Sequence, residues 1–233
     1  MPVNETGYEI RFRIFGVPVM VHPFFWLMAL ILFGNGVVSF QDGHPVLNLV
    51  GMMAIVFASI LVHELGHSAM MARYRIRSEI VLYGMGGYAR STGGRGLSRG
   101  LWDQVLIAFA GPLAQFILYG LVWSLDRFAP PLPPNSFLSY GVLVDVALYC
   151  NLVWPLLNLL PILPLDGGQI CQGFARMFQG HYQGDVTALW ISIITGGVLA
   201  VLAFQYGIFF GGVFLIYITI QNFQSLQQHS SRW

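Results

Sequence analysis

Residues 61–70 read Leu61-Val62-His63-Glu64-Leu65-Gly66-His67-Ser68-Ala69-Met70, a His-Glu-x-x-His pattern inside an apolar run. On an α-helix, His63 and His67 are four residues apart, so both imidazoles project from one face about one turn apart. That spacing lets two nitrogens meet one tetrahedral zinc ion, with Glu64 beside them to take a proton from water. The pattern therefore predicts a long apolar helix that carries half of a metal site.

Chance is the alternative explanation, because short patterns of this kind occur in many unrelated proteins. The position of the pattern argues against chance. An ionisable group near the middle of a membrane helix costs roughly 2.5–3.5 kcal/mol on insertion scales. Three such groups within five residues favour a functional site.

The composition is that of an integral membrane protein. Of the 233 residues, 56% are hydrophobic and 9% are charged, whereas soluble domains carry about 25% charged residues. The formal net charge is +1, and no basic patch has the density that a phosphate-binding face needs. We expect a lipid bilayer around the protein and no nucleic-acid partner.

Six apolar segments predict an α-helical polytopic membrane protein with about six transmembrane helices. Most reach the roughly 20 residues that a helix needs to cross the hydrocarbon core. They cover about 23–40, 46–72, 102–125, 137–160, 186–204 and 207–223. The join between the last two is so short that they should form a helical hairpin. The expected organisation is a cytosolic β segment at 1–22, a six-span domain at 23–223 and a short cytosolic tail at 224–233.

Two segments outside the spans have strand character. Residues 8–14 alternate apolar and charged side chains, and residues 17–21 could return as a second strand after a turn. Residues 80–90 combine β-branched and aromatic residues with glycines, which indicates a strand or hairpin with close backbone approach. A flexible loop is the alternative there. We expect a small membrane-associated β-sheet built from both segments.

The basic residues predict the orientation. All eleven are arginines, and with six spans only Arg127 falls on the side opposite the termini. Such a bias places both termini in the cytosol. His67 lies six residues before Arg73, about 9 Å along a helix, so the expected metal is inside the membrane but nearer the cytosolic face. Because the chain is compact, we expect a bacterial inner (plasma) membrane.

A catalytic zinc usually takes three protein ligands, and the best candidate for the third is Asp166. It follows Pro161 and Pro164, which must break the preceding helix because each lacks an N–H. Irregular backbone at membrane depth is tolerated only where protein buries it or a water-filled cavity meets it. From these residues alone, a metal ligand and an interfacial Asp that caps a helix over 169–178 are equally well supported.

Two motifs carry a family resemblance. One is His63-Glu64-Leu65-Gly66-His67, and the other is Asn158-Leu159-Leu160-Pro161-Ile162-Leu163-Pro164-Leu165-Asp166-Gly167-Gly168. Together they resemble the site-2 protease family of intramembrane zinc metalloproteases, whose second motif reads close to Asn-x-x-Pro-x-Pro-x-Leu-Asp-Gly-Gly. Leu163 stands where a proline is common. Residues 110–114 also resemble the family's middle helix, with Gln115 where Asn is frequent. The layout is similar to the compact microbial branch, which has no appended regulatory domain.

The resemblance implies a zinc-dependent endopeptidase that hydrolyses peptide bonds within or near transmembrane segments of membrane proteins. Such cleavage serves regulated intramembrane proteolysis or the clearance of signal peptides. The resemblance further implies that His63, His67 and Asp166 hold one zinc ion and that Glu64 is the general base. Asn158 is similar to an Asn that helps to hold the substrate or the reaction intermediate.

A substrate helix must unwind before its peptide bonds can be cut, and its backbone then needs new hydrogen-bond partners. A strand edge in the glycine-rich segment could supply them by strand addition. The expected substrate-binding residues are Val81, Tyr83, Gly84, Gly86 and Gly87.

Two other functions fit part of the pattern. A zinc-binding membrane transporter would need polar residues along its full depth, and the first and last two predicted spans offer almost none. A catalytically inactive relative that binds membrane clients would lack some polar residues of the site, yet every one is present. The substrate, the cleavage position, the trigger and the oligomeric state leave no pattern in the sequence.

Overall fold

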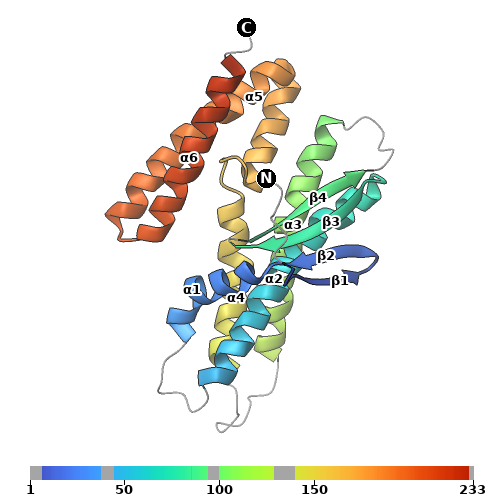
Figure 1. Ribbon diagram of the computed structural model, residues 1–233, viewed down its shortest axis with the longest axis vertical. Coiled ribbons are helices and arrows are strands. Elements are labelled where there is room, and N and C mark those ends of the chain that lie inside the picture. Colours follow the sequence, from blue (N-terminus) through green and yellow to red (C-terminus); the bar gives the residue numbers. More distant parts are fainter. Residues whose placement is uncertain (1–6, 38–44, 85, 94–99, 129–139, 231–233) are drawn as a thin grey trace. The chain divides into compact units, whose positions relative to one another are not determined.

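The computed structural model describes residues 7–37, 45–84, 86–93, 100–128 and 140–230 (Figure 1). The elements in chain order are β1 (Ile10–Ile14), β2 (Val17–Val21), α1 (Pro23–Val37), α2 (Pro45–Arg73), β3 (Arg77–Tyr83), β4 (Gly86–Gly93), α3 (Leu101–Phe128), α4 (Tyr140–Asn158), α5 (Asp166–Gln205) and α6 (Phe209–Ser230). They fall into two compact units, Met1–Leu97 with Ala110–Pro155 and Ser98–Phe109 with Leu156–Trp233.

Among the described residues, five helices are long and apolar enough to cross a membrane, namely α2 to α6. They correspond to the last five predicted segments, so the predicted helical membrane fold is confirmed. The first segment differs. Its helix α1 has 15 residues, fewer than the roughly 20 that a perpendicular span requires. The predicted end of this segment, at residues 38–40, lies outside the described residues.

The predicted β-sheet is confirmed and has four strands in the order β1-β2-β3-β4. β1 and β2 form an antiparallel hairpin, β2 then pairs in parallel with β3, and β3 pairs antiparallel with β4. The flexible loop considered for residues 80–90 is therefore wrong. The β3–β4 turn contains Gly84 and Gly86 with φ of 39° and 147°, values that side chains rarely tolerate. Met85 between them is not among the described residues.

The core of the first unit forms where the sheet meets α1 and α2. Alternate residues of β2 and β3 face the helices, so their branched side chains pack against the apolar face of α2. This contact fixes α2 against the sheet and so determines where the His-Glu-x-x-His turn lies. The buried core consists of Val19, Val21, Phe25, Ala29, Met52, Val56, Ile60, Leu61, Ile80, Leu82 and Cys150.

The second unit is built on a hairpin of α5 and α6, drawn orange to red in Figure 1. A positive φ of 75° at Gly207 terminates α5, and α6 follows at once, as the short join predicted. α5 itself bends at Gly180, where φ is 79° and ψ is 170°. The Arg176 guanidinium and the Asp185 carboxylate form an ion pair across this bend. α6 extends to Ser230, so most of the expected tail is helical, and residues 231–233 lie outside the described part of the chain.

Candidate metal centre

His63 and His67 form a buried pair on α2. Their side chains sit in the first unit with residue exposures of only 4% and 7%. The two Nε2 atoms are 3.0 Å apart. Two nitrogen ligands at roughly 2.0–2.1 Å from a tetrahedral zinc ion are separated by about 3.3 Å. The two nitrogens are at hydrogen-bond distance, about 0.3 Å closer than two ligands of one zinc ion, and so need only a small separation to hold one metal ion.

The ring of His63 is held in one orientation by α3. Its Nδ1 lies 2.8 Å from Oε1 of Gln115, a fully buried side chain. The amide nitrogen of Gln115 donates to the carbonyl of Ser59, at 3.3 Å. Because the Gln115 oxygen can only accept, Nδ1 of His63 carries the proton and Nε2 keeps a lone pair. Metal-binding histidines commonly have such a partner on the second ring nitrogen.

The same network reaches α4. Asn151 is 1% exposed, and its amide nitrogen donates to the Ser59 hydroxyl at 2.9 Å and to the Ala147 carbonyl at 2.8 Å. Ser59 precedes His63 by one helical turn, so both lie on the same face of α2. Buried polar groups need partners of this kind because an unmade hydrogen bond is costly in an apolar interior. Three helices thus cooperate to fix one imidazole.

Gly111 of α3 keeps the space beside the two imidazoles open. A Cβ built at this position would lie 2.3 Å from Nε2 of His67 and 2.9 Å from Nε2 of His63. Such distances are far inside van der Waals contact, so no side chain fits there. The absence of a Cβ leaves room for an ion at the ring nitrogens. Gly66 has a related role, because a Cβ there would meet the Ala110 carbonyl oxygen at 2.4 Å.

Glu64 lies between α2 and the sheet. It is 3% exposed, and the backbone of β4 passes directly beside it. A Cβ at Gly87 would lie 2.9 Å from both Cγ and Oε1 of Glu64 and 2.6 Å from Cδ2 of Leu82. The carboxylate is thus next to the histidine pair on its own helix and next to the β4 backbone.

The five residues expected to bind substrate occupy different positions in the sheet. Val81 and Tyr83 belong to β3, which is flanked by β2 and β4, and Val81 is 1% exposed. Gly84 follows β3 in the turn. Gly86 and Gly87 belong to β4, which is the last strand of the described sheet. Of the two strands that contain these residues, β4 is therefore the one at an edge of the described sheet, whereas the sequence pattern suggested an edge anywhere along residues 80–88.

Asp166 and Asn158 lie in the second unit, at the two ends of the α4–α5 loop. Asp166 is the first residue of α5 and 7% exposed, and Asn158 is the half-buried last residue of α4. The N-cap of α5 is Leu165, with no side-chain cap hydrogen bond, so the alternative role of Asp166 as a helix cap is wrong. The paired glycines that follow pack on the loop backbone. A Cβ at Gly167 would lie 2.0 Å from the Leu159 carbonyl oxygen.

Sequence reasoning missed Gln115 and Gly111 as parts of this site. Both lie in the segment that resembles the family's middle helix, but the resemblance assigned no function to either residue. Their spacing is a usable signal, since residues 111 and 115 share one helix face. A glycine and an amide on the same face of an otherwise apolar helix indicate a close approach and a polar partner.

Comparisons with known proteins agree with this geometry. Residues 51–130 match Peptidase family M50. Zinc metalloprotease MJ0392 of Methanocaldococcus jannaschii is 27% identical over 232 residues, which are 96% of this chain and 61% of that protein. Stage IV sporulation protein FB of Bacillus subtilis is 26% identical over 216 residues, 90% of this chain and 66% of that protein. A putative zinc metalloprotease of Synechocystis is 27% identical, and the matched part spans 52% of it.

The fold of the chain agrees with these sequence matches. The solved site-2 protease from Methanocaldococcus jannaschii superposes with a TM-score of 0.60 at 24% identity, covering 96% of this chain and 95% of that one. Residues 51–130 therefore match the peptidase family M50 model, and the chain has the fold of the site-2 protease. The predicted resemblance to the site-2 protease family is confirmed as a partial match to the family model, relatives named zinc metalloproteases and a shared fold. The chain spans about 61% and 52% of the length of the two zinc metalloproteases named above.

Proposed function

We propose that this protein is an intramembrane zinc endopeptidase that cuts membrane-spanning protein segments. The observation that carries the proposal is the buried His63–His67 pair, with nitrogens 3.0 Å apart and with Glu64 on the same turn of a helix long enough to span a membrane. Three ionisable groups at that depth are costly unless they have a function. The site-2 protease fold and the M50 match support the same reaction class.

His63, His67 and Asp166 are the proposed ligands of one zinc ion. All three are buried, and two imidazoles with one carboxylate are a common donor set of catalytic zinc. The orientation of His63 by Gln115 and the lack of a side chain at Gly111 both favour an ion at the imidazoles. Zinc supplies a Lewis acid that polarises a peptide carbonyl and activates water.

Glu64 acts as general base and then as general acid. Its carboxylate takes one proton from the attacking water while the water oxygen bonds to the carbonyl carbon. The carbon–nitrogen bond then breaks, and Glu64 passes the proton to the departing amine. Asn158, at the end of α4, is proposed to hold the substrate backbone with its amide. The proposed reaction thus uses five side chains, those of His63, Glu64, His67, Asn158 and Asp166.

The proposed substrate is a transmembrane segment that unwinds and pairs with β4. The last strand of the described sheet offers backbone donors and acceptors to an extended peptide. Gly87 places this strand beside Glu64, so a paired peptide would pass close to the base. Gly86 and Gly87 are therefore proposed to bind the substrate backbone. Gly84 allows the turn between β3 and β4. Val81 and Tyr83 support the strand from β3.

We further propose that the metal lies nearer the cytosolic face and that both termini are cytosolic, as the arginine distribution supports. A bacterial inner membrane is the proposed location. The organisation into residues 1–22, 23–223 and 224–233 is proposed as a functional division, with the α6 helix continuing into the last part.

The experiment uses a single-span reporter whose transmembrane segment contains a helix-breaking Asn-Gly pair, mixed with purified protein in detergent. Wild type should cleave it, 1,10-phenanthroline should stop cleavage, and added zinc should restore it. Glu64→Gln should bind zinc and reporter without cleaving. Zinc uptake into proteoliposomes without any cleavage would instead favour a transporter. Reporter binding by wild type without cleavage would favour an inactive relative.

A further inference from the structure

The α4–α5 loop, residues 159–165, has few backbone N–H groups that can form hydrogen bonds. Pro161 and Pro164 have no N–H to donate. The N–H groups of Leu160, Ile162 and Leu165 bond to nearby carbonyls, at 3.1, 2.7 and 2.8 Å. Leu163 differs from these neighbours. Both its N–H and its carbonyl bond to side chains that are far away in the sequence, on α5 and α6.

Ser192 of α5 holds the N–H of Leu163. Its hydroxyl oxygen accepts from Leu163 at 2.9 Å, and its own proton goes to the Ala188 carbonyl at 2.7 Å. Ser192 is fully buried. One hydroxyl therefore serves as acceptor for the loop and donor to its own helix, which fixes its rotation. Nothing in an apolar interior could replace this acceptor if it were removed.

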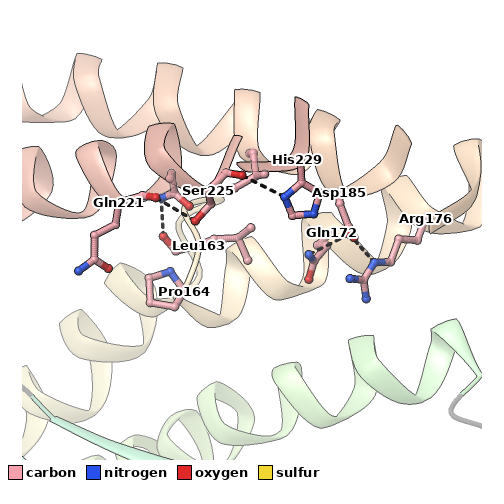
Figure 2. Close-up of a pocket in the computed structure, with 10 residues that line it drawn as sticks. Leu163, Pro164, Gln172, Arg176, Asp185, Gln221, Ser225 and His229 are labelled. Carbon is pink, nitrogen blue, oxygen red and sulfur yellow. Dashed lines mark hydrogen bonds and ion pairs between the residues drawn. The ribbon is translucent and has the colours of Figure 1, made fainter. Parts of the chain in front are cut away.

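Asn222 of α6 holds the carbonyl of Leu163. Its amide nitrogen donates to the Leu163 oxygen at 2.7 Å and to the Ile218 carbonyl at 3.0 Å. Both amide hydrogens are thus used, and the residue is 5% exposed. Asn222 and Leu163 both line a cavity of about 450 Å³, and Figure 2 shows Leu163 there together with Pro164 and Ser225. Ser192 does not line that cavity.

The two bonds hold the two peptide units that meet at Leu163, three residues before Asp166. Asn222 holds the carbonyl of the Leu163–Pro164 unit. The N–H that Ser192 holds belongs to the same planar peptide unit as the Ile162 carbonyl. That carbonyl accepts from the N–H of Leu165, the N-cap of α5. The same unit packs on the first turn of α5, because a Cβ at Gly168 would lie 2.4 Å from the Ile162 carbonyl carbon and the Leu163 nitrogen. Asp166 is the next residue after Leu165.

We propose that Ser192 and Asn222 are positioning residues that set the Asp166 carboxylate by fixing the two peptide units on either side of Leu163. This inference rests on the proposed role of Asp166 as a zinc ligand. Asp166 is the one predicted site residue in the α5–α6 hairpin. The proposal assigns the rest of this hairpin a role in metal binding. Ser192 does not line the cavity, so little water can replace its hydroxyl, whereas at Asn222 replacement by water depends on access from the cavity.

The test measures zinc affinity by competition with a chelator in the purified full chain. Ser192→Ala and Asn222→Leu should each weaken zinc binding roughly 10- to 100-fold, the usual effect of losing an outer-sphere partner. Asn222→Ala should lose less than Asn222→Leu, because water from the cavity can take the place of the amide. Ser225→Ala is the matched control, since within the described part of the chain this hydroxyl donates to the Gln221 carbonyl of its own helix and not to the loop. It should bind zinc as wild type does.

A double-mutant comparison separates positioning from general stability. If Ser192 acts through Asp166, Asp166→Ala with Ser192→Ala should bind zinc no more weakly than Asp166→Ala alone. The Co²⁺-loaded Ser192→Ala protein should also show an absorption spectrum shifted toward that of Asp166→Ala. Additive losses, or lower thermal stability with unchanged zinc affinity and spectrum, would overturn the positioning role. Wild-type affinity in Asp166→Ala alone would instead show that the proposed zinc ligand is wrong.

Discussion

The Nδ1 atom of His63 lies 2.8 Å from the Oε1 atom of Gln115, and both residues are buried. This one contact decides which imidazole nitrogen can face a metal. It also explains why an amide occurs on an apolar face of α3, one turn after Gly111. The relationship links the middle helix of the protein to the His-Glu-x-x-His helix.

Gln115→Leu should weaken zinc binding roughly 10- to 100-fold. The substitution keeps the volume but leaves the Nδ1–H of His63 without an acceptor, so the ring loses its fixed tautomer. Chelator competition measures the affinity. Thermal unfolding of the metal-free protein is the control. If the metal-free protein loses stability and zinc affinity is unchanged, Gln115 only packs the helices.

Gly111→Ala should remove zinc binding, because the new methyl group would overlap Nε2 of His67 and crowd Nε2 of His63. Gly120→Ala is the matched control in the same helix, since a Cβ there meets nothing within 4 Å. The control should bind one zinc and gain up to about 1 kcal/mol of stability from helix propensity. Metal analysis of both purified proteins checks the result. Equal zinc content in the two variants would contradict the assigned role of Gly111.

Gly87→Ala should reduce reporter cleavage strongly while zinc remains bound. The methyl group would press on Cγ and Oε1 of Glu64 and on Leu82, which supply its three nearest atoms, and none of these atoms belongs to a histidine. Gly197→Ala in α5, where a Cβ meets nothing within 4 Å, is the control. Cleavage rate and zinc content are measured on the same preparations. A parallel fall of both quantities would show that the strand only supports the fold.

The pairing of substrate with β4 can be tested with Tyr88→Pro and Ala89→Pro. Successive N–H groups of a strand point to opposite sides, so one proline removes a bond to β3 and the other removes only a donor at the available edge. One variant should therefore fold and bind zinc but cleave poorly, and the other should be destabilised. Thermal stability, zinc content and cleavage distinguish them. Full cleavage by the well-folded variant would rule out strand addition on β4.

Much of the membrane fold could be predicted from hydropathy alone. The apolar segment at 46–72 corresponds closely to α2, and the short join after residue 204 correctly predicted the α5–α6 hairpin. The ends of the helices could not be predicted as well, because hydropathy indicates which residues lie in the bilayer and not where a helix ends. α6 therefore continues through a Gln-rich stretch of good helix formers that was expected to be a tail.

The site was predictable to the extent that chemistry is local in sequence. His63, Glu64 and His67 share one turn, so their arrangement follows from helix geometry. The choice between β3 and β4 as the substrate edge could not be predicted, because the parallel pairing of β2 with β3 joins segments far apart in the chain. The bonds of Ser192 and Asn222 to Leu163 were hidden for the same reason. A buried Ser or Asn shows no partner until the helices are placed.

The most direct test is the zinc content per chain of purified wild type, His67→Ala, Asp166→Ala and Glu64→Ala. We expect one zinc in wild type and in Glu64→Ala, because Glu64 moves a proton and does not hold the metal. His67→Ala and Asp166→Ala should retain much less after dialysis against a chelator. Absence of zinc from all four proteins, or equal zinc with and without the Asp166 carboxylate, would contradict the proposed metal centre.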